Sequence, residues 1–235
     1  GFAALRPKAV LFDMDGVCYD SMPYHVVAWR ESMAHYGLQM TTADAYATEG
    51  ARGIDTIRAM VWQQQQRHMT EEEAQRMYDE KTRIFHQQPP TAVMEGVESL
   101  LKAISLCGLK MGVVTGSGQR PLINRLISDF SDYLTEDHIV TAYDVTRGKP
   151  NPDPYLAGLA KMGNLQPWEA IVVENAPLGV KAGVAARILT VAVNTGPLDR
   201  AMLEEAGADL VFDAMTTLAN AWPRLWNDIK ESTQE

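Results

Sequence analysis

The stretch from residue 8 to residue 21 constrains the fold of this chain more than any other. A short apolar run over residues 9–12 passes directly into Asp13 and, two residues later, Asp15. Such a run, ended by a turn, is typical of a buried strand in a parallel sheet, and open α/β sheets bind ligands beyond the carboxyl ends of their strands. Two carboxylates this close repel each other, and a hard divalent cation such as Mg²⁺ relieves the repulsion. Because Asp and Gly are also common turn residues, a plain acidic turn is the alternative.

The composition of the 235 residues is that of an ordinary soluble globular protein, with 46% hydrophobic and 22% charged residues. The net charge of -9 argues against nonspecific binding to nucleic acid or to an anionic membrane, because both attract basic surfaces. Two cysteines are too few for a disulfide framework and suit a reducing compartment. The chain has no 18-residue apolar stretch and no signal-peptide pattern. We therefore expect a cytoplasmic protein that is a monomer or a weak homo-oligomer.

Helical patterns fill the block between residues 22 and 89. The first begins near a proline and ends just before a glycine, and the last opens with T-E-E-E, a capping residue and an acidic first turn. Four helices are expected, at residues 23–36, 41–48, 54–68 and 70–86. Since no strand-like run occurs in the block, we expect a small helical bundle.

After residue 90 the pattern changes to an alternation of strands and helices. Strands are expected at residues 110–114, 138–142, 170–173, 188–193 and 209–212. Strands separated by helices imply a parallel sheet that is covered on both faces. The sequence therefore predicts a doubly wound, Rossmann-like α/β core over residues 1–21 and 90–235, with an α-helical cap inserted at residues 22–89.

Polar side chains follow several of these strands. They are Asp13 and Asp15 after the first strand, Thr115 and Ser117 after the second, Glu174 and Asn175 after the fourth, and Lys149 in a loop before a helix. In a parallel sheet these loops share one edge, so the side chains are expected to converge. The set fits phosphoryl transfer, in which one carboxylate attacks phosphorus, hydroxyl and ammonium groups hold the oxygens, and a second acid transfers the proton.

These segments, in this order and spacing, resemble the haloacid dehalogenase (HAD) superfamily over essentially the whole chain. The most specific of them is F-D-M-D-G-V, and T-G-S, K-P and E-N follow it. The inserted helices resemble the type 1 cap of that superfamily. The segments Y-H-V-V-A-W and V-V-E-N-A-P-L-G-V look like the β-phosphoglucomutase-like branch, which includes sugar-phosphate mutases, small phosphatases and an inorganic pyrophosphatase.

The resemblance implies a role for each matching residue. Asp13 resembles the nucleophile that becomes an aspartyl phosphate, and Asp15 resembles the general acid and base. Both aspartates are implied to contact Mg²⁺, Asp15 through a flanking backbone carbonyl. Thr115 and Lys149 match the positions that hold the phosphate, and Glu174 matches the acidic metal ligand.

Asn175 departs from the family, which more often has an acid beside the metal-binding glutamate. Its amide oxygen can bind a metal but carries no charge, and the alternative is that Asn175 only hydrogen-bonds its own loop. Glu49 lies in the cap turn E-G-A-R-G, where sugar mutases of this branch tend to carry a basic residue. Our hypothesis is that Glu49 supplies the missing carboxylate to the metal or to a metal-bound water. The alternative is a surface acid in a loop.

Further candidates concern the substrate. The loop T-G-S-G-Q, with Gly116, Ser117 and Gln119, lacks the lysine that is common in mutases after the serine. Arg52 in the cap turn could hold an anion, although an arginine at the start of a helix is usually solvated. His25 stands where the mutases have a histidine suited to proton relay at neutral pH, although a histidine beside an aromatic residue is more often packed.

From these features we expect a Mg²⁺-dependent phosphohydrolase that acts on a small phosphorylated compound, either inorganic pyrophosphate or a sugar phosphate. The alternative is a β-phosphoglucomutase, which interconverts β-glucose 1-phosphate and glucose 6-phosphate and which His25 favours. A third hypothesis is a non-enzymatic ligand-binding protein on the same fold. The intact Asp13, Asp15, Lys149 and Glu174 speak against it, because such a protein needs no nucleophile.

Overall fold

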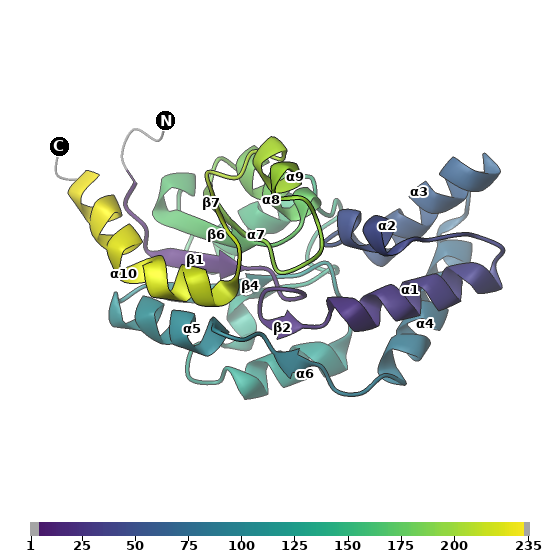
Figure 1. The fold of residues 1–235 in the computed structure, drawn as a ribbon, viewed down its shortest axis with the longest axis horizontal. Helices are drawn as coiled ribbons and strands as arrows, with labels where there is room; N and C mark the ends of the chain where they lie inside the picture. The colour runs from purple at the N-terminus through teal and green to yellow at the C-terminus, as the bar shows by residue number, and fades with distance from the viewer. Residues whose placement is uncertain (1–4, 233–235) are drawn as a thin grey trace.

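The computed structural model describes residues 5–232, and its core is a six-stranded parallel sheet (Figure 1). The strands lie in the order β5-β4-β1-β6-β7-β8. They are β1 (Ala9–Phe12), β4 (Lys110–Val114), β5 (Ile139–Val140), β6 (Ala170–Glu174), β7 (Leu189–Val193) and β8 (Leu210–Phe212). The order reverses at β1, between β4 and β6, and doubly wound sheets bind ligands at that point. The predicted fold class is confirmed.

Helices cover both faces of this sheet (Figure 1). One face carries α5 (Val97–Leu106), α6 (Arg120–Asp129) and α10 (Met215–Ser232), and the other carries α7 (Asp153–Lys161), α8 (Pro177–Ala185) and α9 (Arg200–Glu205). Short 3-10 turns, η1 (Glu136–His138) and η2 (Pro167–Glu169), precede β5 and β6. Because strand side chains alternate between faces, Val10 and Phe12 join one core cluster while Ala9 and Leu11 join the other. All four are fully buried, which explains why β1 is an unbroken apolar run.

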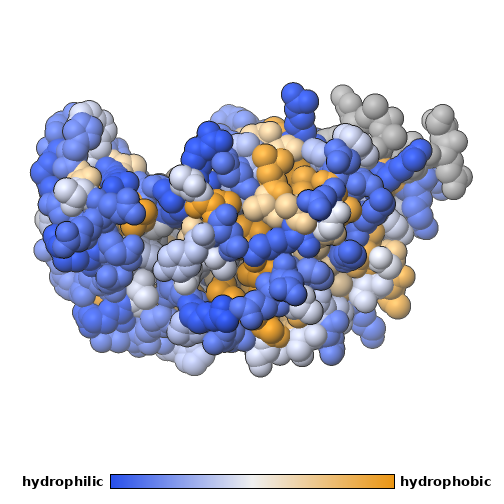
Figure 2. Space-filling view, turned by 180° about the vertical axis from the view of Figure 1, so that it is seen from behind, coloured by the Kyte–Doolittle hydropathy of each residue, from blue (hydrophilic) through white to orange (hydrophobic). Residues whose placement is uncertain are grey.

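Four helices lie between residues 22 and 86, and we keep the name cap for residues 22–89. They are α1 (Met22–His35), α2 (Thr42–Ala47), α3 (Gly53–Gln65) and α4 (Glu71–His86). Thr41 and Thr70 cap the N-termini of α2 and α4 with reciprocal capping boxes. The sequence predicts the cap of α4. The helices enclose an apolar cluster of their own, built from side chains such as Trp29 and Met77. Seen from behind, the cap at left is mainly hydrophilic and a notch along its upper edge separates it from the core (Figure 2).

Two short strands that the sequence did not predict connect the cap to the core. β2 (Tyr19–Asp20) pairs antiparallel with β3 (Ala92–Val93), so the chain leaves and re-enters the core side by side. Arg125 of α6 donates to the hydroxyl and the carbonyl oxygen of Thr91, at 2.9 and 2.6 Å. Asp129 of α6 accepts from the hydroxyl of Tyr19 at 2.8 Å. α6 therefore anchors both connections, while the treatment of residues 22–89 as a separate domain stays a prediction.

None of the helices that the structure describes between residues 5 and 232 combines the length and the apolar character needed to cross a lipid bilayer.

Candidate active site

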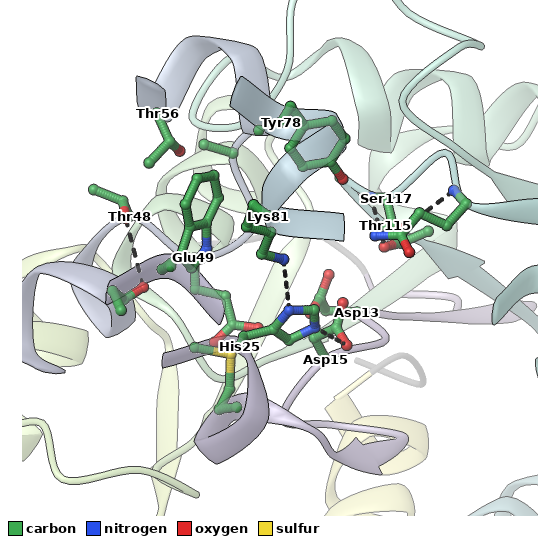
Figure 3. Close-up of a pocket in the computed structure, with 18 residues that line it drawn as sticks. Asp13, Asp15, His25, Thr48, Glu49, Thr56, Tyr78, Lys81, Thr115 and Ser117 are labelled. Atoms are coloured by element: carbon green, nitrogen blue, oxygen red, sulfur yellow. Dashed lines mark hydrogen bonds and ion pairs between the residues drawn. The ribbon is translucent and has the colours of Figure 1, made fainter. Parts of the chain in front are cut away.

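The carboxyl ends of β1 and β4 and the underside of the cap enclose a small pocket (Figure 3). Asp13 and Asp15 line it from the turn after β1, and Thr115, Gly116, Ser117 and Gln119 line it from the loop after β4. The cap contributes side chains from α1, α3 and α4 and from the turn after α2. The cavity measures about 50 Å³, which is room for a few water molecules.

A buried ammonium group joins two of the predicted acidic residues. Lys149 Nζ lies 2.6 Å from Asp13 Oδ1 and 2.6 Å from Glu174 Oε1, and it donates to the carbonyl oxygen of Val114 at 2.9 Å. Tyr155, fully buried on α7, donates its hydroxyl to the same Glu174 oxygen at 2.7 Å. Burial raises the pKa of Asp13 to about 7, although Lys149 opposes the shift. Burial also disfavours the charged lysine, but the carboxylates outweigh it and raise the pKa of Lys149.

Asp15 belongs to a separate chain of hydrogen bonds that starts in the cap (Figure 3). Its Oδ1 accepts from the hydroxyl of Ser21 at 2.6 Å and lies 2.9 Å from Nε2 of His25. On the other side of the ring, Nδ1 lies 2.7 Å from Nζ of Lys81. Since a protonated lysine can only donate, Nδ1 is the acceptor and Nε2 carries the proton that His25 donates to Asp15.

The charges of this chain follow from its burial. Burial by itself raises the pKa of Asp15, but His25 and Ser21 outweigh it and lower the value to about 2. Burial and then the neighbouring Lys81 lower the pKa of His25, so the ring is neutral at pH 7. Burial lowers the pKa of Lys81 to about 8. Asp15 is therefore an ionised carboxylate held between a hydroxyl and a neutral imidazole.

Glu49 reaches into the same site from the turn that follows α2. It is 8% exposed, and its Oε2 accepts from Nδ2 of Asn175 at 3.2 Å. This burial excludes the alternative that Glu49 is a surface acid, and it shows that Asn175 contacts the cap as well as its own loop. Burial, followed by the charges of Asp13 and Asp15, raises the pKa of Glu49 well above its usual range.

The loop after β4 is folded by its own hydroxyl groups. Thr115 Oγ1 accepts from the amide of Ser117 at 3.0 Å, and the hydroxyl of Ser117 accepts from the amide of Gln119 at 3.3 Å. Tyr78 of α4 points its hydroxyl toward this loop (Figure 3). The loop therefore presents hydroxyl groups and backbone to the cavity from the side opposite Glu49.

Arg52 is the predicted substrate-binding residue that the structure does not bring to the cavity. Its guanidinium group donates to both carboxylate oxygens of Asp55, at 2.8 and 3.1 Å, at the start of α3. It is absent from the described residues that line the pocket. Its proposed contact with an anion stays a prediction.

Comparison with known proteins agrees with this geometry. A model of the haloacid dehalogenase-like hydrolase family matches residues 10–193. The chain belongs to this family. Hexitol phosphatase A of Escherichia coli (strain K12) is 32% identical over 211 residues, which are 90% of this chain and 93% of that protein. Beta-phosphoglucomutase of Bacillus subtilis (strain 168) is 27% identical over 212 residues, 87% of this chain and 88% of that protein.

A solved structure from Bacteroides vulgatus, provisionally named a beta-phosphoglucomutase, superposes with a TM-score of 0.91 at 42% identity. It covers 99% of this chain, and 92% of its own length is matched. The predicted resemblance to the HAD superfamily and to its phosphoglucomutase-like members is therefore confirmed, and so is the prediction of an enzyme. The non-enzymatic hypothesis is set aside.

The oxygen atoms of this HAD-like site suit Mg²⁺, although within residues 5–232 no three His, Cys, Asp or Glu side chains form a ready metal-binding group. Lys149 instead bridges Asp13 and Glu174. Beside them, two buried oxygens, Glu49 Oε1 and Asn175 Oδ1, have no hydrogen-bond partner. Unpartnered buried acceptors inside an acidic cluster are what a hard cation would satisfy, so the residues fit the metal.

Sequence reasoning missed Lys81 and Tyr155. Lys81 follows Ala74 and Met77 and precedes Ile84 on the buried stripe of α4, at helical spacing. A lysine within such a stripe is a signal that could have been found, because lysine is almost never fully buried unless it is paired. Tyr155 carries no comparable signal, since a tyrosine on the apolar face of α7 is ordinary packing.

Proposed function

We propose that this HAD-like enzyme is a Mg²⁺-dependent phosphohydrolase that works through an aspartyl phosphate. The observation that carries the proposal is the pair of buried aspartates with opposite environments. Asp13 contacts an ammonium group, whereas Asp15 contacts a hydroxyl group and an imidazole. The ammonium group beside Asp13 favours an ionised nucleophile, and the hydroxyl and imidazole groups around Asp15 orient it for proton transfer, so the two carboxylates are suited to different roles in one reaction.

In the proposed reaction, a carboxylate oxygen of Asp13 attacks phosphorus and the bond from phosphorus to the leaving group breaks. The hydroxyl groups of Thr115 and Ser117 and the ammonium of Lys149 hold the phosphoryl oxygens. A water molecule then attacks the phosphorus of the aspartyl phosphate while Asp15 accepts its proton. The bond between phosphorus and the Asp13 oxygen breaks, the carboxylate is restored and inorganic phosphate leaves. The cap, closed above the site, limits the access of other water molecules.

Asp13, the backbone carbonyl of Asp15, Glu174, Asn175 and Glu49 are the groups that would hold Mg²⁺. When bound, the ion neutralises the negative charge that these carboxylates and the phosphoryl oxygens bring together. The need for it is electrostatic. Four buried or partly buried carboxylates face two ammonium groups in this site, because His25 is neutral.

Inorganic pyrophosphate is the substrate that we propose first. A closed site of about 50 Å³ favours a compact substrate. Phosphate is also a good leaving group without a proton, and Asp15, with its pKa lowered to about 2, is a poor proton donor. A sugar phosphate is the second candidate, favoured by the names of the relatives, which include hexitol phosphatase A and beta-phosphoglucomutase.

The mutase alternative is less well supported by the charges of the cap. A sugar bisphosphate needs cap cations for its second phosphate, but Arg52 is paired with Asp55, which leaves Lys81, hydrogen-bonded to His25, as the cap ammonium at the cavity. Glu49 adds a carboxylate, not a cation, where the cap meets the core. The cytoplasmic location and the state of monomer or weak homo-oligomer stay predictions.

A substrate panel tests the proposed function. Phosphate release with Mg²⁺ is measured on pyrophosphate, hexose phosphates, hexitol phosphates and nucleotides, beside a coupled assay on β-glucose 1-phosphate. We expect the highest kcat/KM on pyrophosphate and no formation of glucose 6-phosphate. Faster turnover in the coupled assay would establish the mutase, and inactivity on every compound would contradict the proposal.

Replacing Glu49 by Ala should weaken the binding of Mg²⁺, because we assign this side chain to the metal site. We expect the Mg²⁺ concentration for half-maximal rate to rise by about tenfold or more, because the cap then supplies no oxygen at Asn175. Titration of phosphate release with Mg²⁺ measures this. Glu31→Ala, on the exposed side of α1, is the matched control and should behave as the parent. An unchanged metal affinity and rate in Glu49→Ala would remove the hypothesis.

Replacing Lys81 by Met should lower kcat by about tenfold, because His25 loses the donor that fixes its tautomer and Asp15 loses its orientation. The effect of Lys81→Met on the stability of the fold should depend on pH. The pKa of Lys81 is about 8 in the folded chain against 10.5 as its ordinary value, so the unfolded chain binds more protons between these pH values. The parent therefore gains stability as pH rises through this window, and Lys81→Met lacks that gain.

Thermal unfolding of the parent and the variant near pH 7 and near pH 10 measures this difference. Lys102→Met, at an exposed position of α5, should follow the parent at both pH values. If the Tm difference between the parent and Lys81→Met does not change with pH, burial does not disfavour the charged form of Lys81.

A further inference from the structure

The loop after β7 contacts both the turn that carries the aspartates and the cap. We call residues 194–198 the seat loop. Thr195 donates its hydroxyl to the carbonyl oxygen of Gly16 at 2.6 Å, in the turn after β1. Leu198 packs against the apolar cluster of the cap. Asn194 donates to the carbonyl oxygen of Leu198 at 2.9 Å and so fixes the shape of the loop.

Gly196 lies between these two contacts, directly against the ring of Tyr46 in α2. A Cβ at Gly196 would lie 2.6 Å from Cε1 and 2.8 Å from Cδ1 of that ring, closer than real Cβ atoms approach. The φ angle of Gly196 lies outside the left-handed region, so the backbone does not require glycine there. The requirement is one of space for Tyr46.

Tyr46 in turn sets the place of Glu49. The two residues lie one turn apart, and the amide of Glu49 donates to the carbonyl oxygen of Tyr46 at 3.4 Å. Glu49 then contacts Asn175. The side-chain nitrogen Nδ2 of Asn175 packs against Gly16, because it lies only 2.0 Å from where a Cβ at that position would be. Since Gly16 accepts from Thr195, the contacts close a ring that begins and ends in the seat loop.

We propose that Gly196 is a positioning residue, whose missing side chain seats Tyr46 so that Glu49 reaches Asn175. The inference deepens the proposed function and rests on it, because it assigns to the seat loop the placement of a cap carboxylate in that site. An added methyl group would lift α2 away from the core and draw Glu49 out of the site. The core itself would keep its fold, because the first contacts of that methyl group are with the ring of Tyr46.

The test compares Gly196→Ala in two backgrounds. With Tyr46 present, we expect kcat/KM for phosphate release to fall by about 10- to 100-fold, as a displacement near 1 Å would cause. In the background Tyr46→Val, which removes the ring, the same substitution should change kcat/KM by less than about twofold. An equal loss in both backgrounds, or no loss with Tyr46 present, would overturn the proposal.

Gly118→Ala is the matched control. Its Cβ would come 2.4 Å from the ring of Tyr143, which is a similar clash, but that side chain is 84% exposed and can turn away. Because Gly118 lies in the loop after β4, its readout is hydrogen exchange at Thr48 and Glu49 and not activity. Exchange at Thr48 and Glu49 that is as fast as in Gly196→Ala would overturn the proposal, because any added methyl near this edge would then disturb the cap turn.

Hydrogen exchange provides a readout that does not depend on activity. The amides of Thr48 and Glu49 should exchange faster in Gly196→Ala than in the parent, and at the parent rate in Gly118→Ala. If the parent releases phosphate from no compound of the panel, the proposed function fails. The exchange rates still test whether Gly196 positions Tyr46 and Glu49. Unchanged exchange in Gly196→Ala would overturn the proposed role of Gly196, even if activity were lost.

Discussion

Asp13→Asn is expected to lose at least about 10⁴-fold in kcat, the loss typical of removing a nucleophile. The amide has the size of the carboxylate and still accepts from Lys149, but it cannot form the aspartyl phosphate. Burial already raises the pKa of Asp13 to about 7, so a neutral side chain at this position should cost the fold little. Phosphate release on the best substrate of the panel measures the loss.

Acid quenching followed by mass spectrometry provides the control for Asp13→Asn. The parent should show a phosphorylated peptide that contains residue 13, and the variant should not. Thermal unfolding should show that the variant is folded. Undiminished turnover by a folded Asp13→Asn would contradict the covalent mechanism, and with it the assignment of Asp13.

Lys149→Met is expected to abolish activity and to lower the free energy of unfolding by about 3–5 kcal/mol. The ammonium lies 2.6 Å from the carboxylates of Asp13 and Glu174, and its side chain is 1% exposed. Without it, two buried carboxylates repel each other with no cation between them. The pKa of Asp13 then rises further above its ordinary value, because Lys149 no longer opposes the effect of burial, so the unfolded chain releases this proton first as pH increases. The deficit of the variant should therefore be smaller near pH 4 than near pH 8.

Urea unfolding of Lys149→Met at both pH values measures this deficit, and Lys161→Met is its control. Lys161 makes an ion pair of 2.8 Å with Asp144, but the lysine side chain is 30% exposed. An exposed pair of this kind contributes at most about 1 kcal/mol. If both variants lose the same free energy of unfolding, the buried ion pairs of Lys149 contribute no more stability than the exposed pair of Lys161.

The sequence predicted the strands because their patterns are local. A run of apolar residues ended by D-x-D, T-G-S or E-N needs no knowledge of the remaining chain to be recognised as a strand and its exit. The strand expected at residues 138–142 shortened to Ile139–Val140, because the amide and hydroxyl of Thr141 bond to Asp144 instead of continuing the sheet. The β2–β3 pair was missed because strands of two residues show no periodicity.

For the site, the sequence by itself determined which chemical groups gather at the edge of the sheet. The loops after parallel strands share one edge of the sheet, so Asp13, Thr115, Lys149 and Glu174 were expected to converge there. Only the tertiary structure decided how the cap meets this edge. It brought Lys81 to His25, buried Glu49 against Asn175, left Arg52 with Asp55 and set Tyr46 on Gly196. Most of these contacts join residues that lie far apart in the chain, and Arg52 pairs with the nearby Asp55 and not with the cavity. A local sequence pattern does not show which partner a side chain contacts once the cap and the core are packed together.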